Sequence, residues 1–145
     1  MPMTDAQEIA RLLARTRVIA IVGLSPKVDR PSHAVAQFLL ARGYDIIPVN
    51  PECAEILGLP CYPDLESIPR AVDMVDVFRK SADVLPIAQD AIRIGAKSLW
   101  LQLGVINPQA TALAEAAGLA AVQDHCLKIE YAKRFGLQPV GGVSV

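Results

Sequence analysis

The chain has 145 residues, which is enough for one domain with a sizeable hydrophobic core. Hydrophobic residues make up 52% of it, but no uninterrupted apolar stretch approaches the roughly 18 residues that a membrane-spanning helix needs. The net charge is −1 and no run of lysine or arginine is present, which argues against nucleic-acid binding through a broad basic surface.

The chain alternates apolar runs typical of strands with segments typical of helices. Residues 4–16 predict a helix in which Thr4 and Gln7 have the spacing of a capping box. Residues 17–22 form a near-continuous β-branched run, which predicts a strand buried on both faces, as in a parallel sheet. The other predicted elements are, in chain order, a helix over 32–42, a strand over 45–49, a short helical turn over 64–68, a strand over 73–78, a helix from 81–83 to 94, a strand over 98–103, a helix over 107–118, a strand over 120–123 and a helix over 126–135.

Asn107 and Pro108 predict an N-cap and the first position of the fifth helix. The segment after the last helix sets the expected extent of the domain. Beyond the last helix, residues 137–145 contain glycine and proline and predict a flexible tail. We therefore expect a single domain over residues 1–136, of which residues 1–16 form the N-terminal helix.

Five strands that alternate with helices predict the α/β class, with a doubly wound parallel sheet of five strands. Right-handed crossovers place the carboxyl ends of all strands at the same edge, and such sheets bind their ligands there, beside the first strand. We expect the order 3-2-1-4-5, with strands counted along the chain. The third strand, at 73–78, carries Asp73 and Asp76, so we expect it at a border of the sheet with one face near water.

The first strand leads into a loop with the properties of a phosphate site. A glycine turn between a strand and a helix directs backbone N–H groups and the positive helix end at the loop. The second and third glycines of the dinucleotide fingerprint G-x-G-x-x-G are missing, and Ser25 and Asp29-Arg30 occupy that stretch. Arginine forms charge-assisted, bidentate bonds to phosphate. The residues predicted to bind a pyrophosphate are Gly23, Leu24, Ser25, Arg30, Pro31 and Ser32. In the alternative, Arg30 pairs with Asp29 or with solvent, and Ser32 is only the helix N-cap.

The second strand ends in Asn50-Pro51, where NAD sites place an acidic residue on the ribose. This ending disfavours NAD without excluding it. The third strand ends in Arg79-Lys80-Ser81, whose two cations suit an extra phosphate on the adenosine side or form an ordinary solvated pair.

The fourth strand is followed by Gln102, Gly104 and Asn107. Gln102 lies in an apolar run and needs a polar partner if it is buried. A ligand that carries amides would supply this partner, and so would a bond to a neighbouring loop. We predict that all three residues belong to the binding site.

These motifs resemble those of the small CoA-binding protein family, which is similar to the nucleotide-binding domain of succinyl-CoA synthetase α-subunits. The matches occur in the family's order between about residues 18 and 131. They are Val-Gly-Leu-Ser at 22–25, Arg-Pro-Ser at 30–32, the run from Gly43 to Pro51, Asp-Val-Phe-Arg-Lys-Ser at 76–81, Gly-Ala-Lys at 95–97, Trp-Leu-Gln-Leu-Gly-Val at 100–105, Ala-Gly-Leu at 117–119 and Cys-Leu-Lys-Ile-Glu at 126–130.

The resemblance implies a Rossmann-like domain that binds coenzyme A at the edge of its sheet. On this basis the Ser25 loop and residues 30–32 take the pyrophosphate, and the Asn50 region flanks the adenosine. Arg79 and Lys80 then meet the 3′-phosphate, and the loop 102–107 meets the pantetheine. Three residues depart from the family pattern: His33 stands in place of a tyrosine, Ala82 in place of an acidic residue and His125 in place of an arginine.

We therefore predict a protein that binds coenzyme A or an acyl-CoA as a non-catalytic carrier, sensor or regulatory module. The sequence has no Ser/His/Asp set, paired carboxylates or Walker loop, and its length does not accommodate the further domains of a synthetase. One alternative is an NAD(P)-binding redox enzyme or sensor. The other is a protein-interaction module that has lost its ligand. The expected partner is a small molecule, without nucleic acid or membrane, and a protein partner is left open.

The cysteines and histidines predict neither disulfides nor a metal site. Cys53, Cys61 and Cys126 are odd in number and lack C-x-x-C spacing, so we expect reduced thiols. His33 and His125, the only histidines, do not form a metal-ligand pattern with Cys126. The N-terminus lacks the basic start and apolar core of a signal peptide, and we expect a cytoplasmic protein.

Overall fold

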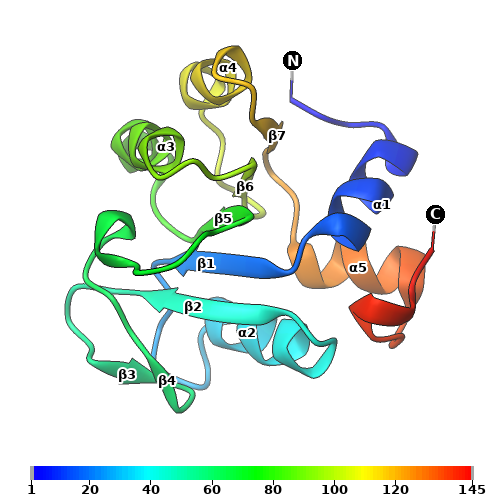
Figure 1. The fold of residues 1–145 in the computed structure, drawn as a ribbon, viewed down its shortest axis with the longest axis horizontal. Helices are drawn as coiled ribbons and strands as arrows, with labels where there is room; N and C mark the ends of the chain where they lie inside the picture. Colours follow the sequence, from blue (N-terminus) through cyan, green and yellow to red (C-terminus); the bar gives the residue numbers. More distant parts are fainter. Residues whose placement is uncertain (1, 145) are drawn as a thin grey trace.

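A parallel five-stranded sheet forms the centre of the structure, which is a computed structural model describing residues 2–144 (Figure 1). The outermost residues of the predicted domain and tail, Met1 and Val145, lie outside the described residues. The strands of the sheet are β1 Val18–Val22, β2 Asp45–Val49, β5 Met74–Val77, β6 Ser98–Leu101 and β7 Ala120–Val122. A separate hairpin pairs β3 Glu55–Ile56 with β4 Leu59–Pro60.

Helices connect the strands, and every predicted helix is present with its ends shifted by a residue or two. The α-helices are α1 Ala6–Arg15, α2 Pro31–Ala41, α3 Val84–Arg93, α4 Pro108–Ala116 and α5 Leu127–Phe135. Three short 3₁₀ helices are η1 Leu65–Ser67, η2 Ser81–Asp83 and η3 Val140–Gly142. Within residues 2–144, none of the helices has both the length and the apolar character needed to cross a membrane.

The order of strands in the sheet is β2-β1-β5-β6-β7, so the expected order 3-2-1-4-5 is wrong. The third strand of the sheet along the chain, β5, lies in the interior between β1 and β6, not at a border. Asp76 in β5 and Asp73, which directly precedes the strand, tolerate this position because each accepts at least one hydrogen bond. Asp73 Oδ2 accepts from the N–H groups of Arg17 (3.1 Å) and Val18 (2.9 Å), and the buried Asp76 accepts from Gln102.

Two layers of helices cover the sheet, with α1, α2 and α5 on one face and α3 and α4 on the other (Figure 1). Side chains alternate between the two faces along each strand: Ile19 and Ile21 belong to the core under α1, α2 and α5, whereas Ala20 belongs to the core under α3 and α4. All three residues are fully buried, as expected for a parallel sheet covered on both sides.

The first two helices begin differently from the prediction. Asp5, not Thr4, is the N-cap of α1, because its carboxylate accepts from the N–H groups of Gln7 and Glu8. Helix α2 begins at Pro31, so Ser32 lies inside the first turn and is not the N-cap.

The last segment of the chain packs on the domain, and Val140 is its most deeply buried side chain. Val140, within the predicted flexible tail, is 2% exposed and belongs to the core under α1, α2 and α5. Its N–H donates to Arg42 O at 2.7 Å. Part of the tail is thereby held against the end of α2.

The N-cap assignment can be tested with two substitutions. Asp5→Ala removes the acceptor of two N–H groups, so the free energy of unfolding should fall by about 1 kcal/mol. Thr4→Ala should change it by less than about 0.5 kcal/mol. Urea unfolding of both variants measures the difference, and an equal loss in the two would contradict the assignment to Asp5.

Candidate functional site

The first strand ends in a turn that only glycine can occupy. Gly23 has φ +87°, and its N–H donates to Val49 O at 2.9 Å, which joins it to the end of β2. A Cβ at this position would lie 2.3 Å from Phe78 O and 3.0 Å from Arg79 Cδ. Gly23 therefore lets the chain pass closely between the ends of β2 and β5, at the switch point where such sheets bind ligands.

Two serines fix the loop that follows. Ser32 Oγ accepts from the N–H of Ser25 at 3.0 Å, and Ser25 Oγ accepts from the N–H of Lys27 at 3.1 Å. Each hydroxyl retains its own proton to donate. Leu24, between the glycine and the first serine, is fully buried and anchors the loop.

A hollow of about 410 Å³, which we call the loop pocket, lies between this loop and the segment after β2. Its lining residues are Gly23, Ser25, Pro26, Lys27, Arg30, Pro31, Ser32, Asn50, Glu52, Cys53 and Phe78. Among the described residues Arg30 forms no ion pair with Asp29 or any other acid, so the predicted alternative of an Arg30–Asp29 pair is not observed. The first turn of α2 carries no acidic residue and its N-cap, Arg30, makes no side-chain cap bond.

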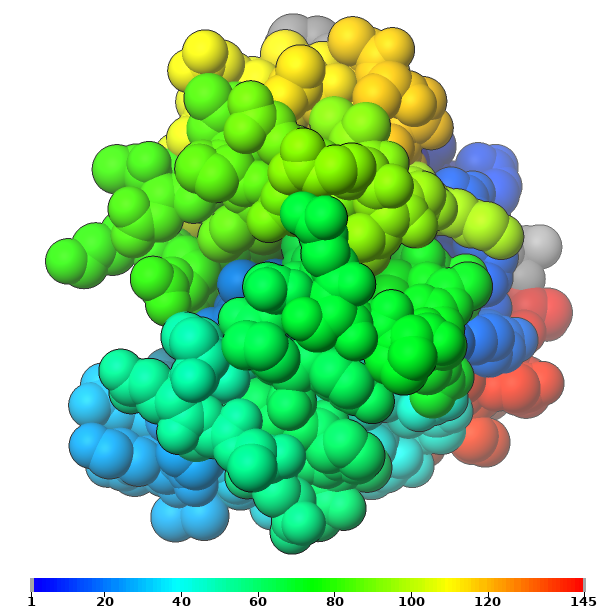
Figure 2. Space-filling view, turned by 60° about the vertical axis from the view of Figure 1, so that its left-hand side comes forward, coloured from blue at the N-terminus to red at the C-terminus, as the bar shows by residue number. Residues whose placement is uncertain are grey.

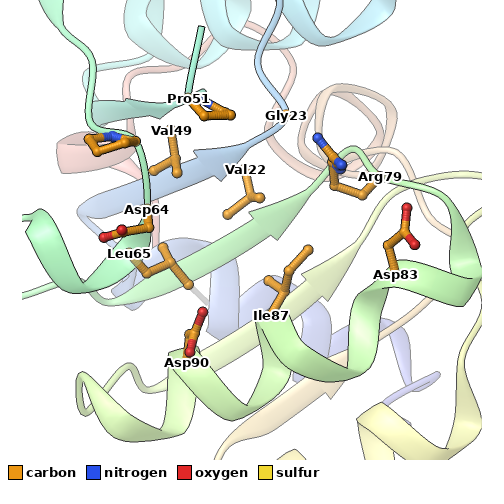
Figure 3. Close-up of a pocket in the computed structure, with 11 residues that line it drawn as sticks. Val22, Gly23, Val49, Pro51, Asp64, Leu65, Arg79, Asp83, Ile87 and Asp90 are labelled. Atoms are coloured by element: carbon orange, nitrogen blue, oxygen red, sulfur yellow. The ribbon is translucent and has the colours of Figure 1, made fainter.

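A second hollow of about 240 Å³, the apolar pocket, lies on the α3 side of the sheet (Figure 3). Figure 3 shows apolar side chains from β1, β2, η1 and α3 facing this space, with charged side chains around them. The lining residues are Val22, Gly23, Val49, Pro51, Pro63, Asp64, Leu65, Arg79, Asp83, Ile87 and Asp90. The space-filling view shows a recess between the segment that follows β2, in cyan to green, and the green α3 segment above it (Figure 2).

The third hollow, the rim pocket, has a volume of about 570 Å³ and lies beyond the ends of β5 and β6. Its lining residues are Phe78, Arg79, Lys80, Asp83, Gln102, Leu103 and Val105. Phe78 also lines the loop pocket, and Arg79 also lines the apolar pocket. The three hollows thus adjoin one another across the carboxyl ends of β2, β1, β5 and β6.

Most of the predicted site residues line one of these hollows. Gly23, Ser25, Arg30, Pro31, Ser32 and Asn50 line the loop pocket, Pro51 and Arg79 the apolar pocket, and Arg79, Lys80 and Gln102 the rim pocket. Leu24, Ser81, Gly104 and Asn107 line none of the three. A binding role for each of the fourteen residues is still a prediction.

The residues outside the hollows hold the surrounding loops. Ser81 Oγ accepts from the N–H of Ile106 at 2.9 Å, and Asn107 Nδ2 donates to Ser81 O at 2.9 Å. Asn107 also caps α4, as predicted. The N–H of Gly104 donates to Asp124 Oδ1 at 2.7 Å. These bonds tie the loop after β6 to η2 and to the loop after β7.

Asn50 joins the ends of the first two strands. Its Nδ2 donates to Leu24 O at 3.1 Å, and its Oδ1 accepts from the N–H of Glu52 at 2.9 Å. Both polar groups of the side chain therefore have partners within the protein. Asn50 holds the wall of the loop pocket in place by these bonds.

Gln102 has its partner inside the protein, in the neighbouring strand β5 and not in the neighbouring loop that we expected as one alternative. It is 2% exposed, and its Nε2 donates to Asp76 Oδ1 at 2.8 Å. Burial raises the pKa of Asp76 to about 8, although the bond from Gln102 acts in the opposite direction. Asp76 Oδ2 has no partner among the described residues. The bond from Gln102 to the buried Asp76 thus lies beneath the rim pocket.

The residues that depart from the family pattern do not line the three hollows. His33 is 4% exposed in the first turn of α2, and its Nδ1 has no partner in the described part of the chain. Ala82 is exposed in η2, and His125 Nδ1 bonds to Gln123 O at 2.7 Å.

Several residues that line the hollows were not predicted as site residues from the sequence. Phe78 is next to the predicted Arg79 and Lys27 is two residues after the predicted Ser25, so a wider window around the motifs would have included both. Leu65 and Ile87 come from η1 and α3, and no sequence signal marks them, because only tertiary packing brings these segments to the pocket.

Comparison with known proteins identifies the family. Residues 17–132 match the protein family described as "CoA binding domain". The chain belongs to this family. The resemblance seen in the sequence is thereby confirmed.

Known proteins match this chain over different lengths. The uncharacterized protein YneT of Bacillus subtilis (strain 168) is 37% identical over 125 residues, which cover 86% of this chain and 93% of YneT. The structure of a hypothetical protein from Pyrococcus horikoshii OT3 matches with a TM-score of 0.87 and 37% identity, over 92% of this chain and 95% of that one. The ADP-forming acetate–CoA ligase I of Archaeoglobus fulgidus is 27% identical over 122 residues. That match covers 77% of this chain but 18% of the ligase, so this domain is related to one part of the larger enzyme.

The raised pKa of Asp76 predicts a pH dependence of stability. The value in the folded protein, about 8, exceeds the ordinary 3.8, so between these values the folded protein retains a proton that the unfolded chain releases. The free energy of unfolding should therefore fall as pH rises through this interval, by at most about 1.4 kcal/mol per pH unit.

Asp76→Asn imitates the protonated acid and should reduce this fall, measured by urea unfolding at about pH 5 and about pH 7.5. Asp29→Asn, at an exposed position, serves as the control and should keep the fall seen in the parent protein. An unchanged pH dependence in Asp76→Asn would show that Asp76 is ionised in the folded state.

Proposed function

We propose that this protein binds coenzyme A or an acyl-CoA at the carboxyl edge of its sheet, as a non-catalytic carrier, sensor or regulatory module. The observation that carries the proposal is the loop pocket in a chain of the CoA-binding domain family. In this pocket a glycine turn, two serine hydroxyls and the unpaired Arg30 adjoin the first turn of a helix.

The pyrophosphate would occupy the loop pocket. Arg30 is free to form a charge-assisted bond, and Lys27 adds a second positive charge against the single acid, Glu52. The uncapped first turn of α2 adds the positive end of the helix dipole. Ser25 and Ser32 can donate their hydroxyl protons, because the oxygens already accept from the loop.

The adenosine would lie in the apolar pocket beside Asn50-Pro51. Val22, Val49 and Ile87 offer apolar surface for a flat base. Arg79, at the border between the apolar and rim pockets, and the neighbouring Lys80 would then face the 3′-phosphate. Asp83 lines both pockets as well, so two positive charges and one carboxylate would surround the 3′-phosphate.

The pantetheine would cross the rim pocket. Gln102 and Val105 form its inner wall, and Leu103, 65% exposed, lies at its outer side. The exposed leucine offers apolar contact to the carbon segments of the arm. The thiol or acyl end would leave toward the loop 103–107.

Further features of the proposal follow from the composition. We infer a small-molecule partner and no nucleic acid, because the chain has no run of basic residues. The three free cysteines suit a reducing compartment, and we propose a cytoplasmic location. Residues 1–136 would be the CoA-binding domain.

A thermal-shift series tests which ligand binds. At about 100 times its Kd, a ligand stabilises the folded state by roughly 2.7 kcal/mol. For a chain of this length this raises Tm by on the order of 5–10 °C. CoA and acetyl-CoA should produce this shift, dephospho-CoA a smaller one, and NAD and ADP little. A shift with NAD and none with CoA would support the redox alternative, and no shift with any of them would support an interaction module.

Substitution of Arg30 tests the loop pocket directly. Arg30→Ala removes a bond to a charged group worth about 1.5–3 kcal/mol, so the Kd for CoA should rise roughly 10- to 100-fold. Arg11→Ala, on the exposed side of α1, is the matched control and should leave the Kd unchanged. Isothermal titration calorimetry measures both, with equal melting temperatures as the check of folding. An unchanged Kd in Arg30→Ala would remove this residue from the site.

A further inference from the structure

Two of the three cysteines lie at the base of the β3–β4 hairpin, beside the loop pocket. Cys53 precedes β3, and Cys61 follows β4 directly. The N–H of Cys61 donates to Ala54 O at 3.0 Å. The pairing of the hairpin therefore continues past its two strands and reaches the residue next to Cys53.

Both cysteines also contact the same carbonyl oxygen. The N–H of Cys53 donates to Asn50 O at 3.4 Å, and the thiol of Cys61 donates to that oxygen at 3.5 Å. Both side chains are half-buried and pack against the same core under α1, α2 and α5. The sulfur of Cys61 is thus directed toward the turn that contains Cys53.

We propose that Cys53 and Cys61 form a reversible disulfide, which makes this hairpin a redox-sensitive modification site at the wall of the loop pocket. The proposal does not depend on which ligand the pocket takes. It assigns a role to residues that the proposed function leaves unused.

The two thiols have different parts in the reaction. Cys53 lines the loop pocket and is the thiol that an oxidant reaches. Burial raises the pKa of Cys61, the bond to Asn50 lowers it and the neighbouring Cys53 raises it further. Cys61 is therefore the weaker first nucleophile and serves as the resolving thiol.

With oxidised glutathione as the oxidant, the step balances as a thiol–disulfide exchange. The Cys53 thiolate attacks one sulfur of the reagent, forms a mixed disulfide and releases one glutathione thiolate. Cys61 then loses its proton to solvent and attacks the Cys53 sulfur, which releases the second glutathione. Two protein thiols are oxidised, and one molecule of oxidised glutathione is reduced to two thiols.

The disulfide would alter the loop pocket through Asn50. Oxidation removes the thiol proton that Cys61 donates to Asn50 O, and it draws the Cys53 sulfur toward the hairpin. The side chain of Asn50 bonds to Leu24 O, next to Ser25. A change in the hairpin is thereby transmitted to the loop that we propose to bind phosphate.

The test treats the folded full-length protein with oxidised glutathione and maps its disulfides by mass spectrometry. The expected product is an intramolecular Cys53–Cys61 bond that dithiothreitol reverses. Cys126 is half-buried and lies outside the hairpin. The Cys126→Ser variant is therefore the matched control and should form the same Cys53–Cys61 bond. Cys61→Ser should accumulate glutathione on Cys53, because the resolving thiol is missing.

Three results would overturn the proposal. They are a parent protein that accumulates glutathione on Cys53 without closing the bond, a disulfide that includes Cys126, and an unreacted Cys53. Each is read from the parent protein, so the conclusion does not depend on the folding of a variant. The failure of CoA binding would leave this result unaffected.

Discussion

The close approach of Gly23 to the backbone of Phe78 is the constraint on which the rest of the site depends. A side chain at position 23 would meet the carbonyl oxygen of Phe78 at 2.3 Å, and backbone cannot move aside as a flexible side chain can. Because residue 23 is glycine, the loops that follow β1, β2 and β5 can begin side by side. Each of the three hollows at this edge shares Gly23, Phe78 or Arg79 with a neighbouring hollow.

Internal hydrogen bonds hold the loops around this constraint. Ser32 fixes Ser25, and Asn50 joins the loop after β1 to the loop after β2. Below the rim pocket Gln102 is held by the buried Asp76. Sequence motifs that mark a binding site therefore contain two kinds of residue, those free to contact a ligand, such as Arg30, and those that position the loops.

The sequence allowed prediction of the fold class, the α-helices and the strands of the main sheet, because these follow from local patterns and the handedness of crossovers. The sequence could not determine the strand order. The same alternation of strands and helices fits a sheet with the third strand beside β2 and a sheet with the third strand beside β1. The burial of Asp76 depends on Gln102, which is distant in the chain and adjacent only across β5 and β6. The N-cap of α1 is Asp5 and not Thr4. Both residues have side-chain oxygens that can accept from the first N–H groups of the helix, so the sequence alone did not distinguish them.

The proposed function requires that the loop after β1 binds the pyrophosphate of coenzyme A. A crystal structure of the protein grown with saturating coenzyme A tests it most directly. We expect the pyrophosphate in the loop pocket, within hydrogen-bond distance of Arg30 and of Ser25 or Ser32, with the base beside Pro51. An empty loop pocket, or coenzyme A bound elsewhere on the molecule, would contradict it.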